Sequence, residues 1–113
     1  MDGRVQVKGN NYFSTTFGAR NIDTVTAPGM VKYLADATER TSQILSDLRI
    51  SIHEHGSAQI GVVAHADCAG NPVPDSTQKR QVSEAVAFLR TEFPGAEIAG
   101  IWVSEHSIVE RIL

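Results

Sequence analysis

One short apolar run restricts the fold of this chain more than any other part of its sequence. Residues 58–64 (AQIGVVA) lie between Gly56, a residue type that commonly ends helices, and a polar loop that begins at His65. The run does not alternate between apolar and polar residues, as a strand with one solvated face would. It therefore predicts a strand covered on both faces, which is typical of a parallel sheet between helices.

The segments around this run predict an alternation of strands and helices. Residues 22–26 (IDTVT) are rich in β-branched residues and precede a Pro-Gly turn, which indicates a short strand. Apolar residues recur at helical spacing over residues 30–55 and again over residues 75–93. Residues 97–104 (EIAGIWVS) indicate another strand, and residues 107–113 fit either a short strand or a frayed helix.

Strand, helix, strand, helix and strand in this order predict an α/β fold. Because right-handed helical crossovers join parallel strands, we expect a three-layer sandwich with a small, mostly parallel central sheet flanked by helices. No repeat or linker divides the chain, so residues 1–113 are expected to form a single domain. Residues 5–17 predict at most a poor helix, because Gly9 and two asparagines weaken it.

Charge and cysteine content exclude several classes of function. The net charge is −3 at pH 7 and no run of Lys or Arg occurs, which argues against nucleic acid or an anionic membrane surface as the main partner. No apolar segment approaches the roughly 20 residues that a membrane span needs, and no signal peptide is expected. A single cysteine cannot form an internal disulfide, so we expect a reducing compartment, the cytoplasm.

The polar loop after the apolar run contains the residues most suited to chemistry. In an open parallel sheet, ligands bind beyond the carboxyl ends of the strands, and His65 and Cys68 are expected there. The H-x-x-C spacing allows an imidazole nitrogen and a thiolate to bind one zinc ion, although a catalytic zinc needs three protein ligands. A buried cysteine beside a solvated histidine is the ordinary alternative, and spacing alone does not decide between them.

Two motifs resemble those of the β-class carbonic anhydrases. GVVAHADCAGNP (residues 61–72) resembles the second metal motif of that family, a strand that leads into His-x-x-Cys-x-Gly. MDGR (residues 1–4) resembles the first motif, Cys-x-Asp-x-Arg, without its cysteine. A group of short carbonic-anhydrase-like proteins resembles this chain along nearly its whole length. The resemblance rests on the motifs MDGRVQ, APG, HGS, VVAHADCAGNPV and IWVSE, which follow one another in this order.

The resemblance implies a β-carbonic-anhydrase-like fold and a Zn²⁺ site in which His65 and Cys68 are metal ligands. It also implies that Asp2 and Arg4 are the catalytic pair. In the family, the arginine holds the carboxylate so that it accepts a hydrogen bond from the metal's water, and in some members the aspartate binds the metal instead. The implied substrate is carbon dioxide or bicarbonate, and the implied assembly is a homodimer or a larger homo-oligomer.

The chain departs from the family pattern at the first motif. The family's third zinc ligand, the cysteine that directly precedes the position of Met1, has no counterpart in the sequence given, so His65 and Cys68 make a two-ligand site unless Asp2, a water or another subunit completes it. The resemblance also implies a central strand before that cysteine. Either the sequence given begins late or the protein lacks this strand.

Three functions stay open from the sequence. The first is a zinc-dependent, carbonic-anhydrase-like lyase that hydrates carbon dioxide or a related small electrophile. The second is a non-catalytic metal-binding or regulatory protein on the same scaffold, and the third is a thiol-dependent enzyme in which His65 is the base for Cys68. Outside this loop, His53 and His55 are expected to stabilise the end of a helix, and Trp102 to be a core or dimer contact.

Overall fold

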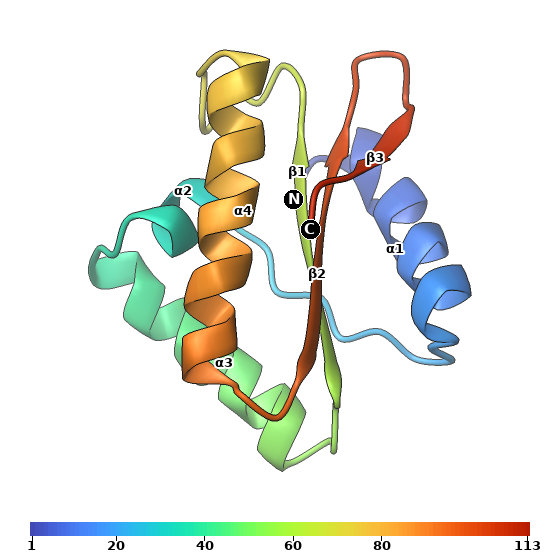
Figure 1. The fold of residues 1–113 in the computed structure, drawn as a ribbon, viewed down its shortest axis with the longest axis vertical. Coiled ribbons are helices and arrows are strands. Elements are labelled where there is room, and N and C mark those ends of the chain that lie inside the picture. The colour runs from blue at the N-terminus through green and yellow to red at the C-terminus, as the bar shows by residue number, and fades with distance from the viewer.

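A computed structural model describes residues 1–113 and confirms the α/β class (Figure 1). The elements follow one another as α1 (Gly3–Phe17), α2 (Met30–Ala35), α3 (Glu39–His53), β1 (Gln59–His65), α4 (Asp75–Glu92), β2 (Glu97–Val103) and β3 (Val109–Arg111). None of the helices combines the length and the apolar character that a membrane span requires.

The sheet is small, open and mixed. Its strands lie in the order β1-β2-β3, with β1 parallel to β2 and β3 antiparallel to β2. Ile60 lies opposite Ile98, and His65 lies opposite Val103. The expected mostly parallel sheet is therefore only half parallel, because the chain reaches β3 through a tight turn and not through a helix. One edge of β1 has no neighbouring strand.

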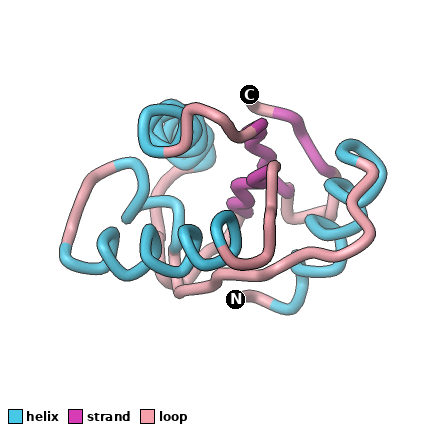
Figure 2. Tube along the Cα trace, turned by 90° about the horizontal axis from the view of Figure 1, so that it is seen from below, coloured by secondary structure: helices cyan, strands magenta, loops and turns pink.

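Residues 22–26 do not form the predicted strand. They belong to a segment, residues 19–29, that passes the open edge of β1 from the α1 side of the sheet to the α2 side (Figures 1 and 2). β-Branched residues favour extended backbone, but a strand also needs a paired neighbour, and no strand lies beside this segment. We call residues 19–29 the crossing segment.

The single helix predicted over residues 30–55 is divided into α2 and α3. Thr38 is the N-cap of α3, and its hydroxyl accepts a hydrogen bond from the Arg40 backbone amide. The Thr41 hydroxyl accepts from the Thr38 amide at 2.8 Å and donates to the Tyr33 carbonyl at 2.5 Å. This reciprocal capping starts a new helix, and apolar periodicity does not detect it because the stripe continues across the break.

α1 is a complete helix, although the sequence predicted only a weak one. Asp2 is its N-cap, and Gly18, with φ of 67°, ends it. Its buried residues Val5, Gly9 and Phe13 face the sheet, and Gly9 allows close approach because a Cβ there would lie 3.2 Å from Val63. Packing against the sheet therefore outweighs the poor helix propensity of this segment.

The larger apolar cluster lies between the sheet and α4. Val82, Val86 and Leu89 of α4 are almost completely buried there, and the Trp102 ring packs with them while its Nε1 donates to Gln78 Oε1 at 2.7 Å. A smaller cluster on the opposite face joins Phe13 of α1 to Ala99 and Ile101 of β2. The predicted core position of Trp102 is confirmed.

β1 differs from the expected strand with two covered faces. Ile60, Val62 and Ala64 are buried toward α4, whereas Gly61 is exposed and Val63 is half-buried on the α1 side. β2, by contrast, is buried at every position after Glu97. The incomplete cover of β1 arises because the strand borders a cavity at its open edge.

Candidate functional site

The two sequence motifs lie together at the carboxyl end of β1. His65 is the last residue of this strand, and the loop after it contains Asp67 and Cys68. The N-terminus of α1 lies at the same end of the sheet, where Asp2 Oδ2 is 4.0 Å from His65 Nε2. The fold thus brings together residues that are more than 60 positions apart in the sequence.

Asp2 and Arg4 form a tight ion pair. The Arg4 Nε lies 3.1 and 3.0 Å from the two Asp2 carboxylate oxygens, and Nη2 lies 2.6 Å from Oδ2. The Arg4 backbone amide also donates to Asp2 Oδ1 at 2.8 Å. Hydrogen bonds from the guanidinium and then from this amide hold the pKa of the Asp2 carboxyl well below its ordinary value of 3.8. Asp2 is therefore an ionised acceptor with a fixed orientation at neutral pH.

Arg4 also contacts the loop that carries Cys68. Its Nη1 lies 3.4 Å from Asp67 Oδ2, and its Nη2 lies 3.3 Å from the Asp67 carbonyl oxygen. Asp67 has φ of 54°, a left-handed conformation that aspartate tolerates better than most residues. Through this contact, Asp67 joins the loop that contains Cys68 to the first motif.

His65 presents one ring nitrogen toward Asp2 and uses the other to fix its orientation. Its side chain is only 13% exposed, and Nδ1 lies 2.7 Å from the Ala66 carbonyl oxygen. A carbonyl oxygen can only accept, so Nδ1 carries the proton of the neutral ring and Nε2 keeps its lone pair. Histidines that bind metals are commonly oriented in this way by a backbone carbonyl.

Cys68 is a half-buried free thiol. It lines the same cavity as His65, but no hydrogen bond joins the two side chains, so the structure lends no support to a thiol nucleophile activated by this histidine. The donor types of His65 and Cys68 fit Zn²⁺, which accepts both imidazole and thiolate. No group of three or more His, Cys, Asp or Glu side chains is arranged to hold a metal ion.

The end of the crossing segment packs directly against the loop that contains Cys68. Gly29, with φ of 62°, packs so closely on the loop that a Cβ there would lie 2.4 Å from the Gly70 carbonyl oxygen. Lys32 Nζ donates to the same oxygen at 2.6 Å. The sequence analysis did not identify Lys32 as a residue that contacts this loop. The one sequence signal for the close packing of these loops is that each contains a glycine, Gly29 in one and Gly70 in the other.

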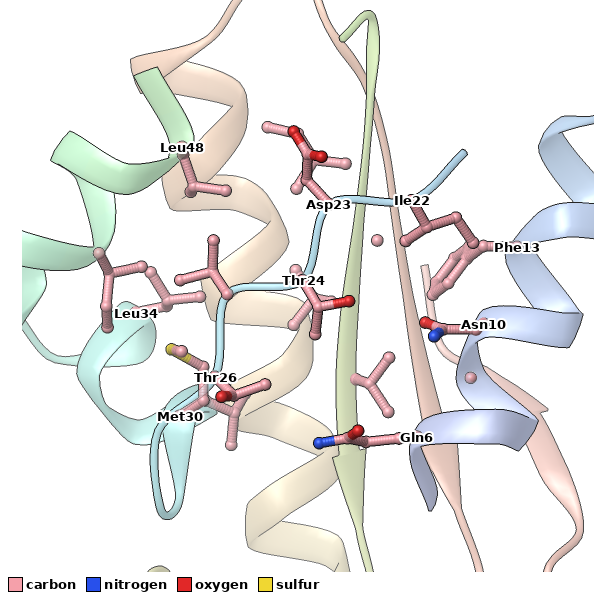
Figure 3. Close-up of a pocket in the computed structure, with 18 of the residues that line it drawn as sticks. Gln6, Asn10, Phe13, Ile22, Asp23, Thr24, Thr26, Met30, Leu34 and Leu48 are labelled. Carbon is pink, nitrogen blue, oxygen red and sulfur yellow. The ribbon is translucent and has the colours of Figure 1, made fainter. Parts of the chain in front are cut away.

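A cavity of about 290 Å³ extends from the site along the open edge of β1 (Figure 3). His65 and Cys68 line one end of it, and Ser51 and Ser57 line the other. Most of the remaining lining residues are apolar. The sequence did not predict this cavity, because it depends on the edge position of β1.

His55 belongs to a separate cluster, away from the candidate site. His53 lies in the last turn of α3 as expected, but His55 follows the helix, and its Nδ1 lies 2.6 Å from Asp23 Oδ2. The Ser51 hydroxyl donates to the same oxygen at 2.7 Å. The hydrogen bonds from Ser51 and then from His55 lower the pKa of the Asp23 carboxyl. This cluster attaches the crossing segment to α3.

We expect acid to weaken this attachment. A carboxyl group whose pKa is lowered by folding adds stability above its ordinary pKa, here 3.8, and that stability disappears as the pH falls through the lower value in the folded state. The midpoint of thermal unfolding should therefore fall more between pH 6 and pH 3 in the wild type than in Asp23→Asn. Asp47→Asn is the control, since Asp47 accepts only from Gln43 on the same helix. Equal acid sensitivity in all three proteins would contradict the assignment.

Comparison with known proteins identifies the family. A family model described as "Putative carbonic anhydrase" matches residues 1–113, the whole of the chain. No match was found among curated proteins or among solved structures. The model spans both motifs as well as the elements between them, so its match does not depend on the His65 loop alone. The chain belongs to this carbonic-anhydrase-like family.

Proposed function

We propose that this protein is a zinc-dependent, carbonic-anhydrase-like lyase that hydrates carbon dioxide or a related small electrophile. The observation that carries the proposal is the Asp2–Arg4 ion pair beside His65, whose Nε2 keeps its lone pair. His65 and Cys68 would hold Zn²⁺, and Asp2 or a second subunit would complete the ligand set. Bound zinc supplies a strong Lewis acid that makes water acidic near neutral pH.

The residues of this chain have distinct roles in the proposed reaction. Asp2 accepts a hydrogen bond from the attacking water, because its carboxylate stays ionised and faces the His65 side of the site. Arg4 positions Asp2 by binding both of its oxygens, and its contacts with Asp67 keep the two motifs together. The apolar cavity beside His65 offers carbon dioxide a weakly hydrated place to bind.

We further propose a carbonic-anhydrase-like three-layer arrangement that assembles as a homodimer or larger homo-oligomer in the cytoplasm. α1 on one face of the sheet and α4 on the other are compatible with this arrangement (Figure 1). The open edge of β1 and the small ligand set both favour completion by a second subunit. A reducing compartment would keep the Cys68 thiol available as a ligand.

Zinc content tests the metal ligands. Protein purified with zinc supplied should contain about one zinc per chain, and His65→Gln or Cys68→Ser should lose most of it, because each removes a protein ligand. His106→Gln is the matched control, since the His106 side chain is exposed after β2 and contacts only Glu105. Full zinc occupancy in Cys68→Ser would contradict the ligand assignment.

Stopped-flow hydration of carbon dioxide tests the activity. Zinc-loaded wild type should accelerate hydration, and Asp2→Asn should be slower by about 10²-fold or more, because the amide is a poor acceptor for a proton in transit. Asparagine is an equally good N-cap, so α1 should be unaffected. Asp36→Asn is the control, because it removes an exposed carboxylate at the end of α2 that does not line the cavity.

A non-catalytic metal-binding or regulatory protein is the second candidate. The observation that favours it is that Arg4 engages both oxygens of Asp2, so His65 and Cys68 are the remaining ligands on this chain. Zinc bound at full occupancy without any acceleration of hydration would establish this candidate in place of the first.

A further inference from the structure

The loop that contains Cys68 is contacted by side chains of two helices that lie far away in the sequence. Arg4 of α1 binds Asp67, the residue before Cys68, as described above. Lys32 of α2 donates from Nζ to the Gly70 carbonyl oxygen at 2.6 Å. Cys68 therefore lies between two residues that are each held by a cationic side chain.

A tight turn joins Cys68 to the residues after it. The Asn71 backbone amide donates to the Cys68 carbonyl oxygen at 3.1 Å and closes this turn. The Asn71 side chain is buried, and its Nδ2 donates to Gln81 Oε1 of α4 at 2.7 Å. One end of the turn is thereby attached to α4, whereas the Gly70 carbonyl within the turn has no donor other than Lys32.

The glycine in this turn needs an external contact to keep one conformation. Glycine has more backbone conformations available than any other residue. Ala69 beside it is exposed and has no polar side-chain group that could hold the turn. A charged donor such as an ammonium group makes a stronger hydrogen bond to a carbonyl oxygen than a neutral donor does. Removal of the Lys32 contact should therefore widen the range of positions open to the Cys68 backbone.

The contact between Lys32 and Gly70 does not involve the open edge of β1. Neither residue lines the cavity there. α2 packs against α4, the helix that follows the loop (Figure 1). Val31 and Leu34 of α2 are buried in the larger apolar cluster, so the position of Lys32 is set by packing in the core.

We propose that Lys32 is a positioning residue for the metal ligand Cys68. It fixes the Gly70 carbonyl and thereby limits the motion of the Cys68 backbone before a metal arrives. Groups that orient metal ligands from outside the ligand set typically contribute about 10–100-fold to metal affinity. The inference rests on the zinc site proposed above, in which Cys68 is a ligand, but the mobility of the loop can be measured without metal.

Hydrogen exchange in metal-free protein tests the effect on the loop. Lys32→Met keeps an unbranched side chain but cannot donate a hydrogen bond. The Asn71 amide should therefore exchange about tenfold faster in NMR spectra, because the turn opens more often. The amides of β2 should exchange at the wild-type rate, since a loss of global stability would accelerate them too. Lys32→Arg keeps a charged donor and should restore slow exchange.

Zinc titration tests the effect on the metal. Lys32→Met should raise the Kd for zinc by about tenfold or more, and Lys32→Arg should restore most of the affinity. Lys79→Met is the matched control and should bind zinc as the wild type does. Like Lys32, Lys79 is half-buried with its Nζ over an aromatic ring, but it pairs with Glu110 and not with the loop.

The two measurements separate the possible failures. A wild type that binds no zinc would overturn the proposed function, whatever the exchange rates, and this inference with it. Equal zinc affinity in wild type and Lys32→Met would overturn the inference alone, as would unchanged exchange of the Asn71 amide. An equal loss of affinity in Lys79→Met would also overturn the inference, because the loss would then come from the change in charge and not from the loop contact.

Discussion

Replacing Gly29 by alanine should destabilise the protein and loosen the Cys68 loop. Gly29 has φ of 62°, and a left-handed conformation costs a residue with a Cβ about 1–2 kcal/mol. The new methyl group would also lie 2.4 Å from the Gly70 carbonyl oxygen, so backbone must move at a further cost of about 1–3 kcal/mol. Denaturant unfolding of Gly29→Ala measures the sum, and zinc titration measures the effect on the loop.

Gly18→Ala separates these two contributions. Gly18 has φ of 67°, close to that of Gly29, but a Cβ there meets nothing within 4 Å. Its replacement should cost only the left-handed backbone term, about 1–2 kcal/mol, and should not affect zinc affinity. Equal losses of stability in both variants would show that the contact between Gly29 and Gly70 contributes nothing.

Ile101→Ala should cost about 2–5 kcal/mol of unfolding free energy, because it leaves a cavity in the core. Ile101 is completely buried in β2, where it packs with Phe13 and Ala99 on the α1 side of the sheet. A domain of this kind is stable by only about 5–15 kcal/mol, so the variant should lie close to the limit of folding. Chemical denaturation followed by circular dichroism provides the measurement.

Ile108→Ala is the matched control for Ile101→Ala. The same atoms are removed, but Ile108 is 66% exposed in the turn between β2 and β3. Surface replacements of this kind usually change stability by no more than about 0.5 kcal/mol. If both variants lose the same stability, the smaller apolar cluster under α1 does not form part of the core.

The parts of the fold that were predicted well have complete local signals. β1 and β2 are short apolar runs between turn residues, and α4 has an apolar stripe with a proline on either side. These signals depend on residues that are neighbours in the sequence, so they survive without any knowledge of the tertiary structure. The α/β class follows from their order.

The parts that were predicted poorly depend on distant partners. Residues 22–26 have the composition of a strand but no neighbouring strand to pair with. α1 has poor helix propensity, and its burial of Val5 and Phe13 against the sheet compensates. The break between α2 and α3 is set by threonine hydroxyls, including the bond from Thr41 to Tyr33 eight residues earlier.

In the candidate site, too, residues in short motifs could be proposed from the sequence, whereas contacts between distant residues could not. His65 and Cys68 were proposed from their spacing after a predicted strand, whereas Asp2 and Arg4 were proposed only because residues 1–4 resemble a family motif. The contact between Arg4 and Asp67 joins residues 63 positions apart, and the contact between Lys32 and Gly70 joins residues 38 positions apart. No local pattern specifies such contacts, and only the folded chain brings their partners together.

Asp2 couples the chemistry of the site to the first turn of α1. The same carboxylate that Arg4 orients beside His65 also accepts the Arg4 backbone amide at the start of the helix. A rotation of Asp2 toward a metal would release both bonds at once, so the amino-terminal turn would fray whenever the carboxylate became a ligand. Loss of helical signal at low temperature on adding zinc would thus distinguish a coordinated aspartate from a free one.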